Sequence, residues 1–121
     1  MKTTSTWTAL IYCDLREDCH GREHSLEEVV AVCRDRCAAV GLEVTVTPTT
    51  FVCSAGQGPG AVVGLINCPR VPFTPVVIRA LALELAWQLK AALGQERLTV
   101  VLPEETVMLG VASTKPLRWL D

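Results

Sequence analysis

Residues whose side chains can act in catalysis or bind a metal are concentrated in two segments of the chain, 14–24 and 67–73. A cysteine thiolate is a nucleophile when a nearby positive charge or a helix N-terminus lowers its pKa and a base accepts its proton. Cys68 fits this description, because Arg70 is close in sequence and a long apolar segment with a helix start follows. Segment 14–24 could supply the base and a carboxylate. The candidate catalytic residues are Cys68, Arg70, His20 and Asp14.

The same segments allow two other interpretations. One is a zinc site, whose possible ligands would be Cys13, Cys19, His20 and His24. The cysteine spacing is wider than in usual zinc pairs, so we expect solvated loop histidines, no metal and no cofactor. The other is a carboxylate acid–base site at Asp14, because Glu17 and Asp18 have arginine neighbours and are expected to be solvated. His24 is also an alternative to His20 as the base.

Residues 56–60, Gly-Gln-Gly-Pro-Gly, have the composition of a phosphate-binding loop without its context. A phosphate loop follows a strand and opens a helix, and the Walker form also carries a lysine followed by serine or threonine. Residues 56–60 join two predicted strands and contain no lysine. We therefore predict a turn here rather than a nucleotide site.

Two helices must hold these segments in place. Ser25 and Glu28 form a capping box, in which the serine bonds forward and the glutamate bonds back, before a predicted helix over 26–40. A Thr-Pro pair at 74–75 is typical of a helix start, and Gly94 is suited to the end of that helix. The second helix is apolar on nearly all sides, so we expect it to be covered on more than one.

Five segments before, between and after the two predicted helices have the pattern of strands, over residues 6–13, 42–53, 61–67, 97–102 and 106–111. The order strand–helix–strand–strand–helix–strand predicts one α+β domain over 1–121, a ferredoxin-like βαββαβ sandwich with a possible extra C-terminal strand. Its sheet would be mostly antiparallel, with both helices on one face. Pro48 cannot donate to a ladder, which indicates an edge strand or a bulged one.

We further expect the strands that begin at residues 6 and 61 to lie side by side and parallel at the centre. The loops that follow them, at 14–24 and 67–73, would then meet at one end of the sheet. A site formed there would lie beside the N-terminus of the second helix, whose dipole favours an anion. The candidate ligand-binding residues are Tyr12, Asn67 and Phe73.

The helix-free face of such a sheet should be polar at alternate positions, but residues 6–13 and 61–67 are apolar on both sides. A second copy of the chain is the simplest cover, so we expect a homo-oligomer, most simply a twofold dimer. The apolar tail at 117–120 is the alternative cover.

Composition limits the function classes. Of the 121 residues, 50% are hydrophobic and 20% charged, and the net charge is −2. Basic residues are scattered, so we expect neither nucleic acid nor a membrane surface as a partner. No secretory or membrane-spanning pattern is evident, which favours the cytoplasm and reduced cysteines. The sequence favours a small oligomeric protein that binds a small apolar or anionic ligand or a protein partner; the alternative is an enzyme with a Cys/His/Asp site in loops 14–24 and 67–73.

Overall fold

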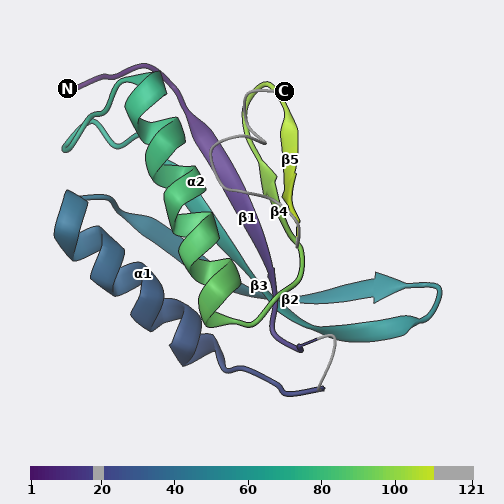
Figure 1. Ribbon diagram of the computed structural model, residues 1–121. Helices are drawn as coiled ribbons and strands as arrows, with labels where there is room; N and C mark the ends of the chain where they lie inside the picture. The colour runs from purple at the N-terminus through teal and green to yellow at the C-terminus, as the bar shows by residue number, and fades with distance from the viewer. Residues whose placement is uncertain (18–20, 111–121) are drawn as a thin grey trace.

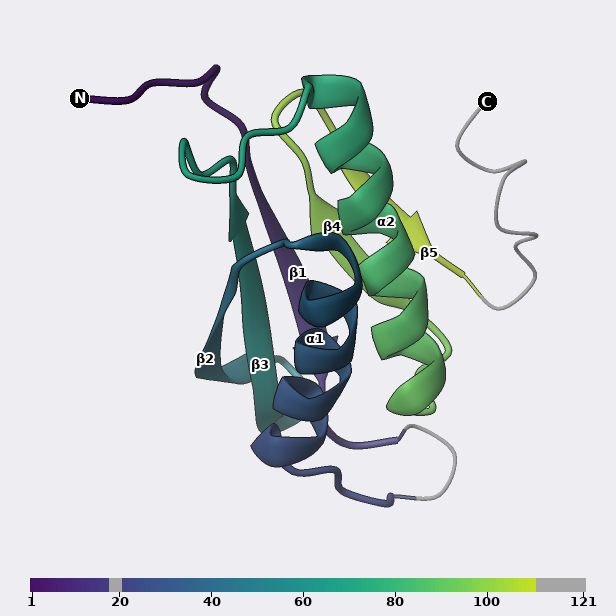
Figure 2. The same ribbon diagram turned by 90° about the vertical axis from the view of Figure 1, so that its left-hand side faces the viewer.

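A computed structural model describes residues 1–17 and 21–110 (Figure 1). The elements in chain order are β1 (Thr8–Asp14), α1 (Leu26–Val40), β2 (Val44–Cys53), β3 (Gly56–Ile66), α2 (Pro75–Ala92), β4 (Leu98–Val101) and β5 (Thr106–Leu109). The strands form one sheet in the order β2-β3-β1-β4-β5. Figure 2 shows α1 and α2 packed on the same side of this sheet. The ferredoxin-like α+β prediction is confirmed, including the extra C-terminal strand.

The predicted parallel pair at the centre of the sheet is wrong. β1 and β3 are adjacent but antiparallel, with Thr8 opposite Ile66 and Asp14 opposite Gly60. The reason lies in the connections. The crossover through α1 returns the chain parallel to β1, and the β2–β3 hairpin then reverses it. β3 must therefore run against β1, and the loops after β1 and β3 leave from opposite ends.

Local sequence signals account for both helices. The Ser25 hydroxyl accepts a hydrogen bond of 3.3 Å from the backbone N–H of Glu28, and Gly41 ends α1 with φ of 77°. The second half of the predicted capping box is different, because the Glu28 carboxylate contacts the ring of His24 rather than the serine backbone. Thr74 caps α2 by accepting from the N–H of Val77 at 3.4 Å.

The core lies between the two helices and one face of the sheet. Alternate residues of β1 and β3 point into it, as the period-two pattern requires. One side of α2 is buried through Ile78, Ala82, Leu83, Leu85, Ala86 and Leu89, whereas Val76 and Val77 in its first turn are exposed although the sequence is apolar. The principal buried side chains are Ala9, Ile11, Cys13, Val29, Cys33, Ala61, Val63, Leu65, Ile78, Leu85 and Leu89.

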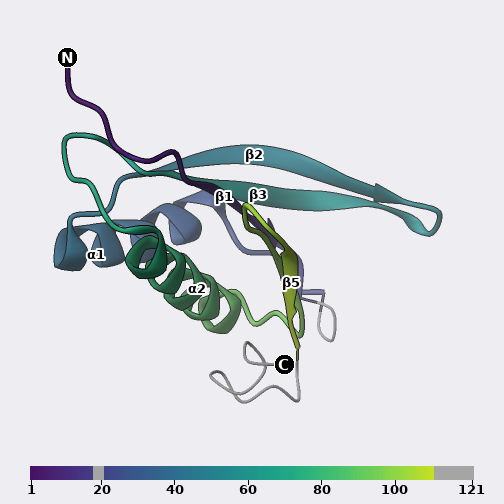
Figure 3. The same ribbon diagram turned by 90° about the horizontal axis from the view of Figure 1, so that it is seen from above.

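The β2–β3 hairpin is longer than predicted and projects past the end of the helices (Figure 3). β3 begins at Gly56 rather than at residue 61. The turn predicted at residues 56–60 is therefore wrong, because this glycine-rich segment is entirely strand and the turn is confined to residues 54–55. β2 lies at the edge of the sheet, where Pro48 was expected. Because β1 pairs with β3 only as far as Gly60, the outer part of the hairpin forms an arm with one neighbour fewer.

The second face of the sheet carries neither of the two described helices. β3 was predicted to be buried on both sides, but this face leaves Ile66 58% exposed, and Leu10 of β1 is 39% exposed. Met108 of β5 is 61% exposed on the same face. The predicted tail cover at 117–120 lies outside the described residues. Among the helices that the structure describes, none has the length and apolarity to cross a membrane.

Candidate functional site

The predicted catalytic residues are divided between opposite ends of the sheet. Asp14 ends β1 opposite Gly60, at one end of β3. Cys68 and Arg70 follow the other end of β3, where the N–H of Asn67 donates to the carbonyl of Trp7 at 3.0 Å. His20 lies outside the described residues. The expected site that joins loops 14–24 and 67–73 is therefore not formed, because antiparallel strands send their following loops in opposite directions.

In the segment after β3, Cys68 and Arg70 make contacts that serve the structure of the loop. The Arg70 guanidinium pairs with the Glu43 carboxylate at 2.9 Å, and both side chains are largely exposed. Cys68 is half-buried, and its carbonyl accepts from the N–H of Val71 at 3.0 Å within a turn. The positive charge that was expected to activate the thiol is therefore engaged by a carboxylate from the α1–β2 connection.

Asn67 organises the backbone around it. Its Nδ2 donates to the carbonyls of Ser5 at 3.0 Å and Phe73 at 2.9 Å, and more weakly to the Thr4 hydroxyl at 3.4 Å. Its Oδ1 accepts from the N–H of Phe73 at 2.9 Å. Since the residue is only 7% exposed and its side-chain amide bonds to backbone groups, Asn67 is suited to holding the loop before α2 in place. Phe73 packs against the core beside it.

The end of the sheet at Asp14 has two hollows, which we call together the Asp14 site. The first, of about 360 Å3, lies between the loop after β1, with Arg16 and Glu17, and the hairpin arm, with Gln57. The second, of about 340 Å3, lies on the helix-free face and is lined by residues of β1, β4 and the turn before β4. Asp14 and Phe51 line both. Each volume falls within the range of about 300–1,000 Å3 typical of small-molecule pockets, and both hollows are open to solvent.

Two aromatic rings form part of this site. Tyr12 of β1 and Phe51 of β2 meet edge to face, with ring centroids 6.3 Å apart and planes inclined by 61°. Phe51 reaches across β3 over Gly60, and its ring fills the space that a Cβ of that glycine would occupy. Tyr12 was predicted from the sequence, whereas Phe51 was not.

The polar members of the second hollow come from the turn after α2 and from β4. Gln95 is buried, and its Nε2 donates to the carbonyls of Arg16 at 3.2 Å and Leu93 at 3.0 Å. The exposed Arg97 and the half-buried Thr99 continue the lining along β4. No pattern in the sequence identifies Gln95 and Arg97, because only the pairing of β4 with β1 brings them beside Asp14.

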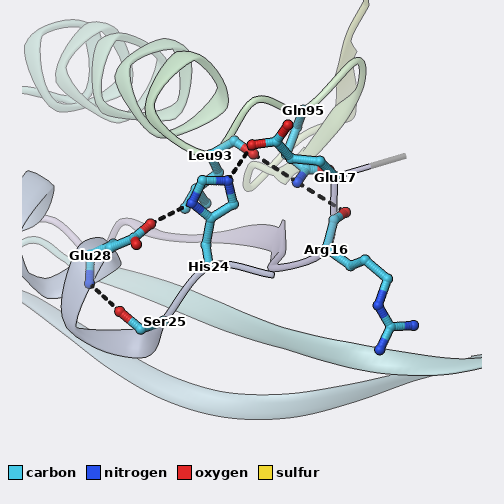
Figure 4. A network of polar contacts seen from close by, with 7 residues as sticks. All are labelled: Arg16, Glu17, His24, Ser25, Glu28, Leu93 and Gln95. Atoms are coloured by element: carbon cyan, nitrogen blue, oxygen red, sulfur yellow. Dashed lines mark hydrogen bonds and ion pairs between the residues drawn. The ribbon is translucent and has the colours of Figure 1, made fainter. Parts of the chain in front are cut away.

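A polar network supports the loop that forms one wall of the site (Figure 4). His24 contacts two carboxylates: its Nε2 lies 2.6 Å from Oε2 of Glu17, and its Nδ1 contacts Oε2 of Glu28. The side chain of His24 is 2% exposed. Hydrogen bonding to Glu28, and then to Glu17, raises the pKa of His24 above its ordinary value, against the opposing effects of burial and Arg22. His24 was expected to be a solvated loop residue, and this expectation is wrong.

The cysteines of the core do not resemble nucleophiles. Burial raises the pKa of Cys13 to about 12 and that of Cys33 to about 11. Both thiols therefore stay protonated near neutral pH, as small apolar core residues. Within residues 1–17 and 21–110, no group of three or more His, Cys, Asp or Glu side chains is arranged to hold a metal ion.

Comparison with known proteins gives similarity of fold. No protein-family model matches the chain, and no curated protein matches its sequence. A phage SAM lyase in complex with S-methyl-5'-thioadenosine superposes with a TM-score of 0.75 at 11% identity, covering 91% of this chain and 93% of that one. A phage SAM lyase in the apo state gives 0.71 at 13% identity, covering 94% and 98%. This chain thus shares its fold, over nearly its whole length, with a small enzyme that has been seen with a bound nucleoside.

Proposed function

We propose that the protein binds a small nucleoside thioether of the S-methyl-5'-thioadenosine type at the Asp14 site. The observation that carries the proposal is the shared fold, at a TM-score of 0.75, with a phage SAM lyase in complex with that compound. The sequence alone predicted a small apolar or anionic ligand. The ligand proposed here is neutral and carries an aromatic ring, hydroxyl groups and a thioether.

The chemistry of the Asp14 site supports this class of ligand. A purine ring can pack against the aromatic pair of Tyr12 and Phe51, as aromatic rings favour offset and edge-to-face contacts. The half-buried Asp14 carboxylate can accept hydrogen bonds from ribose hydroxyls, because an ionised carboxylate is a strong acceptor without donors of its own. The exposed guanidinium of Arg97 can donate hydrogen bonds to the carboxylate of a ligand that also carries one.

The Asp14→Asn substitution tests the proposal. We expect calorimetric titration with S-methyl-5'-thioadenosine to show binding to the wild-type protein and about tenfold or more weaker binding to the variant, since a hydrogen bond to a charged group contributes about 1.5–3 kcal/mol. Asp35→Asn is the matched control, because Asp35 is exposed on α1 and away from the hollows. Absence of binding to the wild type, or equal affinity for both variants, would contradict the proposal.

An enzyme at the same site is the second candidate, favoured by the description of both structural neighbours as SAM lyases. It differs from the enzyme expected from the sequence, which needed Cys68 and Asp14 together. Incubation of the protein with SAM, followed by chromatography for S-methyl-5'-thioadenosine, distinguishes a lyase from a protein that only binds. Asp14→Asn and Asp35→Asn again serve as the site variant and its control.

We also propose that a second copy of the chain covers the helix-free face at the end remote from Asp14, most simply in a twofold dimer in the cytoplasm. The support is the exposure of Leu10 and Ile66 on this face, beside a mainly apolar hollow of about 540 Å3 at the end remote from Asp14. Light scattering should give about twice the 13.1 kDa chain mass, and Ile66→Lys should restore the single-chain mass. Val76→Lys, at a residue 80% exposed on α2, is the control. A wild-type protein of single-chain mass would refute the dimer.

A further inference from the structure

The described parts of the connection between β1 and α1, residues 15–17 and 21–25, are held from three sides. The Glu17 side chain lines the first hollow and at the same time contacts His24. His24 in turn contacts Glu28 in the first turn of α1. The backbone of the loop also closes on itself, with the N–H of His24 donating to the carbonyl of Leu15 at 2.6 Å. The wall of the Asp14 site is therefore tied to a helix through one imidazole ring.

The third side is the turn after α2. Glu17 packs where a side chain of Gly94 would lie, since a Cβ there would be 2.7 Å from the carboxyl carbon of Glu17. Gly94 also has a φ of 61°, which favours glycine. The next residue, Gln95, donates to the backbone carbonyl of Arg16 at 3.2 Å and lines the second hollow. Both hollows are thus coupled to the position of Glu17.

The two contacts of His24 require a charged ring. A neutral imidazole has one N–H, so it can donate to one carboxylate only, and its other nitrogen then faces a carboxylate oxygen as a second acceptor. The imidazolium donates to both. Among the described residues, the charged groups that face the ring are Glu28 from α1 and Glu17 and Arg22 from the loop. The turn after α2 presents the uncharged Gly94 and Gln95.

We propose that His24 is a positioning residue for the Asp14 site: its two ion pairs hold the Arg16–Glu17 wall in place, and ligand affinity falls when the ring loses its charge. The ligand part of this inference rests on the proposed function. The direction of this pH dependence follows from the raised pKa of His24. A group whose pKa is raised on folding stabilises the folded wall fully below its unfolded value, near 6.5, and this contribution is lost as the pH rises through the folded value.

Glu28→Gln is the decisive variant, because Glu28 is 45% exposed and the amide keeps its size. Affinity for S-methyl-5'-thioadenosine should be constant below the pKa of His24 and fall by about fivefold to tenfold above it, a typical strength of coupling between sites. In Glu28→Gln the fall should begin at lower pH, because one carboxylate that favours the charged ring is gone. Glu27→Gln, one residue earlier on the exposed face of α1, should leave the profile unchanged.

A second readout does not depend on any ligand. NMR titration of the ring gives the charge state of His24, and a His20→Gln variant assigns the signals, since the chain has 2 histidines. Amide hydrogen exchange then reports on the wall itself. After correction for the intrinsic dependence of exchange rates on pH, the backbone amide hydrogens of Glu17 and His24 should exchange with solvent faster once the ring is neutral. Unchanged exchange, or identical affinity profiles in wild type and Glu28→Gln, would overturn the inference. If the wild type binds no nucleoside thioether at any pH, the proposed function fails, and exchange alone then decides the role of His24.

Discussion

Replacing Gly60 with alanine is expected to lower the free energy of unfolding by about 3 kcal/mol, at the upper end of the cost of overpacking a filled space. A Cβ at this position would collide with the ring of Phe51, because it would lie 2.6 Å from Cδ2 of that ring. It would also lie 2.9 Å from the backbone carbonyl oxygen of Cys13. The ring can turn away, but the carbonyl belongs to the central strand and cannot. The variant should therefore lose stability and also displace Phe51 from Tyr12.

Urea denaturation measures the first effect, and NMR contacts between the rings of Tyr12 and Phe51 measure the second. The matched control is Gly58→Ala, two residues earlier on the same strand and the same face. Its Cβ would find the Arg16 guanidinium at 3.6 Å, an ordinary contact, so its stability should change by less than about 0.5 kcal/mol. Equal stability of the two variants would show that Gly60 is not required for the packing of Phe51.

Replacing Asn67 with aspartate should cost about 3 kcal/mol at neutral pH, although the two side chains have the same shape. The new carboxylate keeps the acceptor for the N–H of Phe73 but loses the amide donor, so a negative oxygen faces the carbonyls of Ser5 and Phe73. A buried group left without its partner costs about 1–3 kcal/mol, and more when it is charged. A purely ligand-binding asparagine would show no such loss.

The pH dependence of this variant has a definite sign. Burial and two carbonyl oxygens raise the folded-state pKa of the new carboxyl above its unfolded value, near 3.9. The variant should thus be least impaired below about pH 4, where the protonated carboxyl donates one hydrogen bond, and lose stability as the pH rises through the raised value. Thr4→Val, which removes only the 3.4 Å contact, should have little effect. Denaturation of both variants at several pH values checks the prediction, and a loss independent of pH would contradict it.

Predictions from the sequence were most accurate where a structural signal is local. The start of α1 at Ser25, the start of α2 at Thr74 and the left-handed Gly94 each follow from residues within one turn of the boundary. Strand direction is set by connections instead. The parallel central pair was an error of topology, because the β2–β3 hairpin reverses the chain once more than was allowed for.

The candidate site depended on that topology, which is why it changed more than the fold did. Asp14 and Tyr12 were identified from the end of a strand and from its alternation. Phe51 and Arg97 could not be identified, because they meet Asp14 only through the register of β2 on β3 and of β4 on β1. No spacing in the sequence shows such a register. His24 was misjudged for a different reason: Glu28 and Glu17 are only four and seven residues away, but their spacing does not show that the chain folds so as to place both carboxylates against the ring.

Because β1 and β3 are antiparallel, the regions around Asn67 and Asp14 lie at opposite ends of the sheet. β1 has 7 residues, and at about 3.3 Å per residue its ends are roughly 20 Å apart. Substitutions separated by more than about 7–10 Å, without shared partners, usually add in free energy. The backbone anchor at Asn67 and the proposed binding site at Asp14 can thus be altered separately, and the change in stability of a double variant should be the sum of those of the two single variants.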